Sequence, residues 1–120
     1  MAPKGGECPV SVTLQVIAGK WKPVILWRLI EDTHRFGQLK QAIPGVTQRM
    51  LTQQLRELER DGIVARKVYP VVPPRVEYSL TDFGRTLEPI LGLMCRWGKA
   101  HQKQVAARRR KTDPGLSQAA

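Results

Sequence analysis

The sequence predicts a mainly α-helical domain with one small β-hairpin, and three observations lead to this fold class. Three leucines recur at the spacing of a buried helix face: Leu51, Leu55 and Leu58. Two runs with β-branched residues, 63–68 and 76–80, flank a proline-rich connection, as in an antiparallel hairpin. Apolar residues return to helical spacing over 83–97, so a long helix follows the hairpin.

Composition and charge narrow the class of protein. The chain has 120 residues, 42% of them hydrophobic, which suits one domain with a modest core. No apolar run is long enough for a membrane span, and the first residues carry no secretion signal, so we expect a cytoplasmic protein without a membrane partner. The net charge of +10 favours a polyanionic partner such as nucleic acid, although a solvated basic surface has the same composition.

The chain begins with elements that support the domain. Residues 1–7 are small and polar, and we expect a flexible arm there. Ser11 is a candidate N-cap for a short helix over 12–18, in which Leu14 and Ile17 would face the core.

The segment 21–30 is the most apolar part of the chain. A helix that is apolar nearly all round belongs in the centre of a domain, so Trp21 and Trp27 are predicted core residues. A polar connection follows it, and residues 34–36 have the character of a very short strand.

Two helices joined by a tight turn occupy residues 36–61. The first, over 38–43, ends at Pro44-Gly45, because proline resists continuation and glycine permits a positive φ. Thr47 is a candidate N-cap for the second, which runs from 48 to 60 and ends before Gly62. The leucine face turns inward, so five polar side chains lie on the opposite face: Gln48, Arg49, Thr52, Gln53 and Arg56.

The remaining elements are a hairpin and a long last helix. The connection 69–75 holds three prolines, which cannot donate to a strand ladder, so it forms a stiff hairpin tip. The last helix is expected from Asp82 to about Ala106, capped by Thr81 and kinked at Pro89. The domain would therefore span 8–106, and 107–120 would be a basic, disordered tail.

Helix, turn, helix, hairpin and helix follow one another as in a winged helix-turn-helix domain. The chain resembles the HxlR family of bacterial transcriptional regulators, relatives of the MarR group, over residues 8–101. The matching residues are Cys8-Pro9, Gly19 to Lys22, Arg35-Phe36, Ala42 to Gly62, Pro73 to Thr81 and Trp97-Gly98.

The resemblance implies a homodimer paired through the first and last helices. It also implies an operator with two half-sites, and regulation of a neighbouring gene or of the protein's own gene. Gly37 departs from the family pattern, since Ser or Thr often caps a helix there. Glycine is a tolerable cap, so we expect that helix to form.

A helix over 47–61 would enter the major groove with its N-terminal side chains at the base edges. Arg49 can bind a guanine edge, and Gln48 and Gln53 can bind adenine, with Thr52 beside them. Arg56 lies one turn further on and is expected to meet phosphate.

Other residues would hold the DNA backbone. Lys40 and the N–H groups at Thr47 and Gln48 are candidates for phosphate contact. Arg75, on the hairpin tip, suits a narrow minor groove or a phosphate. For each of these residues, plain exposure to solvent is the alternative interpretation.

Cys8 is a candidate sensor. The resemblance implies that some family members use a cysteine at this position to sense oxidants or electrophiles. Lys4 and the positive charge of the protein favour the reactive thiolate, whereas Glu7 opposes it. The alternative is that Cys8 packs under the domain. Cys95 lies near the apolar stripe of the last helix and is expected to be a small buried residue.

Catalysis and metal binding are not expected. The two histidines lie beside no nucleophile motif, and no metal-ligand spacing or phosphate-binding glycine loop is present, so we predict no enzyme activity, metal or cofactor. The prediction is a homodimeric, sequence-specific repressor that binds a double-stranded DNA operator and responds to an oxidant or small-molecule effector. The alternative is a non-specific DNA- or RNA-binding protein without signal sensing.

Overall fold

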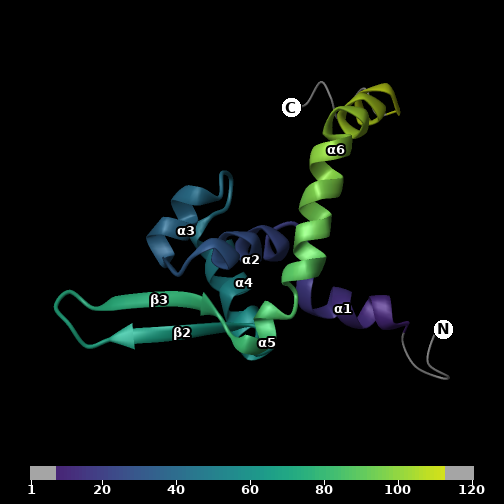
Figure 1. Ribbon diagram of the computed structural model, residues 1–120. Coiled ribbons are helices and arrows are strands. Elements are labelled where there is room, and N and C mark those ends of the chain that lie inside the picture. Colours follow the sequence, from purple (N-terminus) through teal and green to yellow (C-terminus); the bar gives the residue numbers. More distant parts are fainter. Residues whose placement is uncertain (1–7, 113–120) are drawn as a thin grey trace. The chain divides into compact units, whose positions relative to one another are not determined.

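The computed structural model describes residues 8–112, so the expected arm over 1–7 and the residues 113–120 lie outside the described part. The chain divides into two compact units, and the division falls between Glu88 and Pro89 (Figure 1). Within residues 8–112, no helix combines the length and apolar composition that a bilayer span requires.

Helix α1 (Pro9–Ile17) begins three residues earlier than predicted. Pro9 fits the first turn of a helix because its missing N–H would have no partner there. The N-cap position is therefore Cys8, which makes no side-chain cap bond, and Ser11 lies inside the helix, so the predicted Ser11 cap is wrong. Ile17 is buried as expected, but Leu14 is 49% exposed and does not belong to the core of this chain.

Helix α2 (Lys22–Glu31) forms the centre of the first unit through one face only. Ile25, Leu26 and Leu29 are at most 1% exposed. Trp21, just before the helix, and Trp27 are only half-buried, so their assignment to the core is correct in part.

Helices α3 (Phe36–Ala42) and α4 (Gln48–Arg60) form the predicted helical pair. The N-cap of α3 is Arg35, whose N–H donates to Gln38 Oε1 at 2.8 Å, as in one half of a capping box. Gly37 is thus the second residue of the helix, and its predicted role as a cap is wrong.

The turn and caps around α4 agree with the sequence prediction. Gly45 has a φ of +88° in the turn, and Gly62 has a φ of +75° just after the helix. Thr47 caps the helix, because its hydroxyl oxygen accepts from the Met50 N–H at 3.1 Å.

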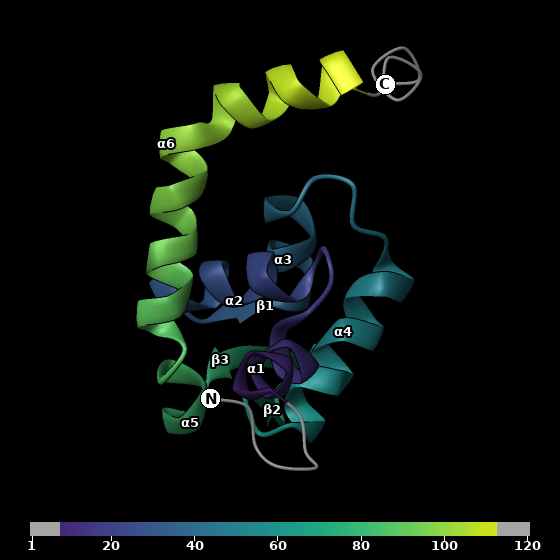
Figure 2. The same ribbon diagram turned by 90° about the vertical axis from the view of Figure 1, so that its right-hand side faces the viewer.

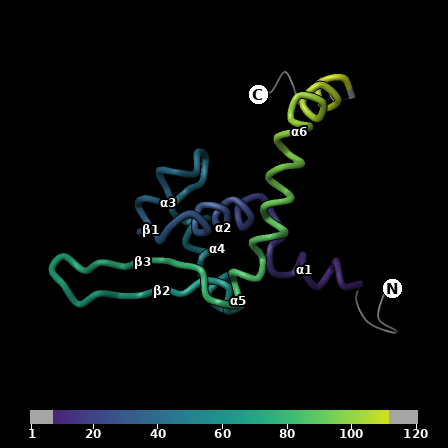
Figure 3. Tube along the Cα trace, viewed as in Figure 1, coloured from purple at the N-terminus to yellow at the C-terminus, as the bar shows by residue number. Residues whose placement is uncertain are grey.

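Three antiparallel strands form a small sheet in the order β1-β3-β2. The hairpin joins β2 (Val64–Tyr69) to β3 (Arg75–Leu80), with Val64 opposite Leu80 and Tyr69 opposite Arg75. Strand β1 (His34–Arg35) pairs with the other edge of β3. The tip of the hairpin extends away from the helices of its unit (Figures 1 and 3).

The predicted single last helix is two helices, α5 (Asp82–Arg85) and α6 (Glu88–Thr112). Thr81 caps α5 as expected, since its hydroxyl oxygen accepts from the Gly84 N–H at 2.9 Å. Pro89 is the second residue of α6, where a missing N–H costs no bond, so the chain restarts a helix instead of kinking one.

Helix α6 is longer than the sequence predicted. Residues 107–112 of the expected tail are helical. They include alanine, arginine and lysine, which are good helix formers, and basic side chains near a helix C-terminus are favoured by its dipole. Figure 2 shows that α6 bends partway along its length.

Candidate nucleic-acid interface

Helix α4 is held by one apolar face. Its three leucines are at most 2% exposed, as the spacing predicted: Leu51, Leu55 and Leu58. The helix packs against α2 and β2. Because these contacts fix the rotation of α4 about its axis, they also determine which side chains point away from the core.

Five residues that are predicted to contact DNA share the outward face of α4. Gln48, Arg49, Gln53 and Arg56 are exposed. Thr52 is half-buried, and its hydroxyl donates to the Gln48 carbonyl at 2.8 Å. These five residues, together with Glu57, line one open hollow of about 660 Å³.

Thr47 and Lys40, which are predicted to contact the DNA backbone, both lie at the surface. Thr47 is exposed, but its hydroxyl is engaged in the helix cap, so its backbone N–H is the group left for an anion. Lys40 is exposed in the last turn of α3.

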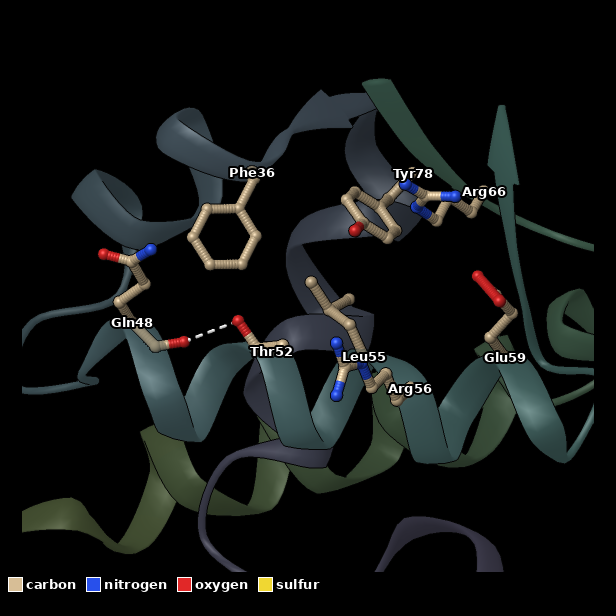
Figure 4. Close-up of a pocket in the computed structure, with 8 residues that line it drawn as sticks. All are labelled: Phe36, Gln48, Thr52, Leu55, Arg56, Glu59, Arg66 and Tyr78. Atoms are coloured by element: carbon tan, nitrogen blue, oxygen red, sulfur yellow. Dashed lines mark hydrogen bonds between the residues drawn. The ribbon is translucent and has the colours of Figure 1, made fainter. Parts of the chain in front are cut away.

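A second hollow, of about 510 Å³, lies between α4 and the sheet (Figure 4). Arg56 of α4 and Arg66 of β2 supply positive charge from two elements, and Arg66 lies beside Tyr78 in the close-up. Arg66 is not predicted from the sequence, because its signal is weak: it is one basic residue in a strand with several polar positions. The remaining lining residues are Phe36, Gln48, Thr52, Leu55 and Glu59.

Arg75 lies apart from the α4 residues and lines neither hollow. It is the first residue of β3, and its guanidinium carbon is 4.2 Å from the centre of the Tyr69 ring. Its Nε is 3.5 Å from Glu77 Oε2. The side chain is therefore packed at the base of the hairpin tip, where these contacts restrict its reach.

An ion pair ties α4 to the start of α2. Lys22 Nζ lies 2.6 Å from Glu57 Oε1, and Lys22 is only 6% exposed. The other oxygen of the Glu57 carboxylate accepts from Gln53 Nε2 at 3.3 Å. The hydrogen bond from Lys22 lowers the pKa of Glu57 below its ordinary value of 4.5, and the bond from Gln53 and the charge of Arg60 act in the same direction.

Both cysteines are free thiols. Cys8 is exposed at the N-terminal end of α1, so the structure of this chain does not bury it. Cys95 is half-buried on α6, which is less than the expected burial. Within residues 8–112, no group of three or more His, Cys, Asp or Glu side chains is placed to hold a metal ion.

A capped helix with a buried leucine face and an outward polar face, followed directly by a hairpin, defines a winged helix-turn-helix protein. The family model described as HxlR-like helix-turn-helix matches residues 16–106. The chain belongs to this family, and it is a transcriptional regulator and not an enzyme. The resemblance seen in the sequence is thereby confirmed.

Relatives and solved structures agree with this assignment. The HTH-type transcriptional regulator YdeP of Bacillus subtilis is 54% identical over 98 residues, which cover 82% of this chain and 77% of YdeP. The structure of the redox regulator HypR in its oxidized form is 58% identical, with a TM-score of 0.76, and the match covers 78% of this chain and 96% of that one. The reduced form of the transcriptional regulator YodB from B. subtilis is 32% identical, with a TM-score of 0.67, over 78% of this chain and 93% of that one.

Proposed function

We propose that the protein is a sequence-specific repressor that binds an inverted-repeat operator as a homodimer. Helix α4 would enter the major groove. The wing over 69–75, which is the hairpin tip with the strand residues Tyr69 and Arg75, would contact the flanking groove or backbone. The single observation that carries this proposal is the outward face of α4, where Gln and Arg side chains reach solvent opposite a buried leucine face. A protein acting on chromosomal DNA would work in the cytoplasm.

The side chains on and near α4 would contact two different parts of the DNA, the base edges and the phosphates. Gln48, Arg49 and Gln53 lie in the first half of α4 and would read base edges, with Thr52 beside them. Arg56 and Arg66 would clasp a phosphate across the hollow between α4 and the sheet, because they approach it from two elements. Lys40 and the N-terminal N–H groups of α4 would hold a neighbouring phosphate. Arg75 would add charge beside the flanking groove.

The homodimer is supported by apolar side chains that this chain leaves uncovered. On α1, Val10 is 65% exposed, and Leu14, one turn later on the same face, is 49% exposed. On α6, Leu93 and Trp97 are 59% and 60% exposed. Apolar side chains gathered on a helix in this way mark an interaction surface, and a two-fold dimer would cover them with the same surfaces of a second copy.

Control by an oxidant or electrophile would act through Cys8. The exposure of its thiol supports this proposal, and so does the likeness to HypR, a redox regulator. Modification of Cys8 at the end of α1 would disturb the proposed dimer contact on that helix and thereby the spacing of the two α4 helices. To test it, DNA affinity is compared before and after a mild oxidant or a quinone. An equal response in wild type and Cys8→Ser would remove Cys8 from the mechanism.

The test of DNA reading is a fluorescence-anisotropy titration in rising salt. The probes are a duplex from the region upstream of the protein's own gene and a scrambled duplex of the same composition. We expect tighter binding to the upstream duplex and a steep loss of affinity with salt, because phosphate contacts release counterions. Equal affinity for the scrambled duplex and for RNA would favour the non-specific nucleic-acid binder instead.

A matched pair of variants separates base reading from general charge. Arg49→Ala removes a charge near the start of α4, and Arg60→Ala removes one at its last residue. We expect the first to reduce the preference for the upstream duplex and the second to weaken both duplexes alike. Equal effects of the two variants on the preference would contradict the assigned orientation of α4.

A further inference from the structure

Lys22 is a buried charge whose partner lies on the helix proposed to read DNA. A charged side chain at 6% exposure is costly unless it is paired and hydrogen-bonded. Its ammonium donates to Glu57 Oε1 at 2.6 Å, so the carboxylate is anchored from α2, 35 residues away in the sequence. The ion pairs Arg60–Asp61 and Arg75–Glu77 join residues that are close along the chain and have no such reach.

The anchored carboxylate dictates how Gln53 is oriented. Gln53 Nε2 lies 3.3 Å from Glu57 Oε2. An ionised carboxylate only accepts hydrogen bonds, so the amide must turn its NH₂ group, not its oxygen, toward Glu57. The charge of Lys22 favours that ionised form. One N–H and the oxygen of the Gln53 amide then remain for another partner.

We propose that Lys22 and Glu57 are positioning residues that set the base preference of Gln53. This inference rests on the proposed function, in which α4 lies in the major groove. An amide that offers one N–H and its oxygen matches adenine, which presents the N7 acceptor and the N6 donor. Without Glu57 the amide is free to turn over and to offer both N–H groups to guanine, which presents two acceptors. The ion pair therefore favours adenine over guanine at the position that Gln53 reads.

The key variant removes the ion pair without leaving a buried charge unpaired. Lys22→Met combined with Glu57→Leu replaces two charges by apolar side chains of similar size, a change that buried ion pairs commonly tolerate. Lys22→Met alone is the second variant, because Glu57 keeps 29% of its side chain exposed and stays solvated. Glu31→Ala is the matched control, since it removes an exposed carboxylate from α2, the helix that carries Lys22.

The experiment begins with wild-type protein selecting its site from a pool of random duplexes. Each adenine of that site is then changed to guanine, and the adenine at which Gln53→Ala no longer discriminates is the position read by Gln53. At this position we expect wild type to prefer adenine by roughly 5- to 150-fold, the range for one bidentate contact. The double variant should lose most of this preference, Lys22→Met should lose part of it, and Glu31→Ala should keep it.

A coupling test separates positioning from a general structural role. Adding Gln53→Ala to the double variant should cause little further loss at that base, because the three residues act as one unit. Two results would overturn the inference and leave the proposed function intact. One is full adenine preference in the folded double variant. The other is that the losses caused by the double variant and by Gln53→Ala are additive. If wild type selects no sequence at all, the proposed function fails and the inference fails with it.

Discussion

Gly84 is predicted to be a position where alanine destabilises the protein although the residue is helical. A Cβ atom built on Gly84 would overlap the backbone oxygen of Ile63 and lie 3.2 Å from Ile63 Cγ2. The Ile63 carbonyl cannot easily move away, because it accepts from the Thr81 N–H at 3.1 Å. Gly84→Ala must therefore displace α5 from the residue that leads into β2.

The magnitude follows from two opposing effects. Overpacking a rigid site costs up to about 3 kcal/mol. Alanine recovers at most about 1 kcal/mol relative to glycine in a helix. The free energy of unfolding should thus fall by about 2 kcal/mol, which lowers Tm by roughly 8 °C for a chain of this size.

Gly37→Ala is the matched control. Gly37 is also helical, but nothing lies within 4 Å of the position that a Cβ atom would occupy there, so this variant should gain about 0.5–1 kcal/mol. Both free energies are measured by urea unfolding followed by circular dichroism. A Gly84→Ala protein as stable as Gly37→Ala would refute the reasoning about the contact with Ile63.

Three further predictions concern the core, the ion pair and the dimer. Leu55→Ala should lower the free energy of unfolding by about 2–5 kcal/mol, since Leu55 is 2% exposed. A urea titration measures this loss, and a loss below about 1 kcal/mol would contradict the burial of Leu55. The pKa of Glu57 is lower in the folded chain than its ordinary 4.5, so its ion pair stabilises the fold above that pH and is lost as the pH falls through the folded value. Unfolding curves of wild type and Glu57→Gln should therefore converge below pH 4.5 and differ most near neutrality, and a constant difference would speak against the pairing. Trp97→Lys should weaken dimerisation in sedimentation experiments, because it places a charge at a position of α6 where the side chain is 60% exposed. Val71→Lys at the hairpin tip should not weaken it. Equal effects of the two variants would contradict the proposed dimer surface.

Much of the fold was predictable because its signals are local. The leucine spacing over Leu51, Leu55 and Leu58 identified α4 and its buried face, and hydroxyl caps at Thr47 and Thr81 marked two helix starts. Gly62 marked the end of α4 through its positive φ. Such features depend on residues within a few positions of one another, so a single sequence contains them.

Features that depend on distant residues could not be predicted. Lysines are almost always solvated, and only the approach of Glu57 from α4 explains the burial of Lys22. Leu14 has the spacing of a core residue, yet its own chain leaves it 49% exposed. The position of Arg66 across from Tyr78 follows from the strand register, which the sequence alone did not specify.

The candidate site also has features that could be predicted from the sequence and features that could not. The outward residues of α4 were predictable once its buried face was known, because a helix has a fixed period. The packing of Arg75 against Tyr69 and Glu77 was not, since it depends on how the two strands align. The exposure of Cys8 could not be predicted either. It depends on where α1 begins, and the helix begins at Pro9 and not after Ser11.

A footprint of wild-type protein on the DNA upstream of its gene tests the central claim most directly. Two protected half-sites related by a two-fold axis, with centres about 10 base pairs or a multiple of that apart, are the predicted result, because two α4 helices of one dimer would meet the same face of the duplex. Uniform protection that follows protein concentration and shows no half-sites would contradict a sequence-specific, dimeric regulator.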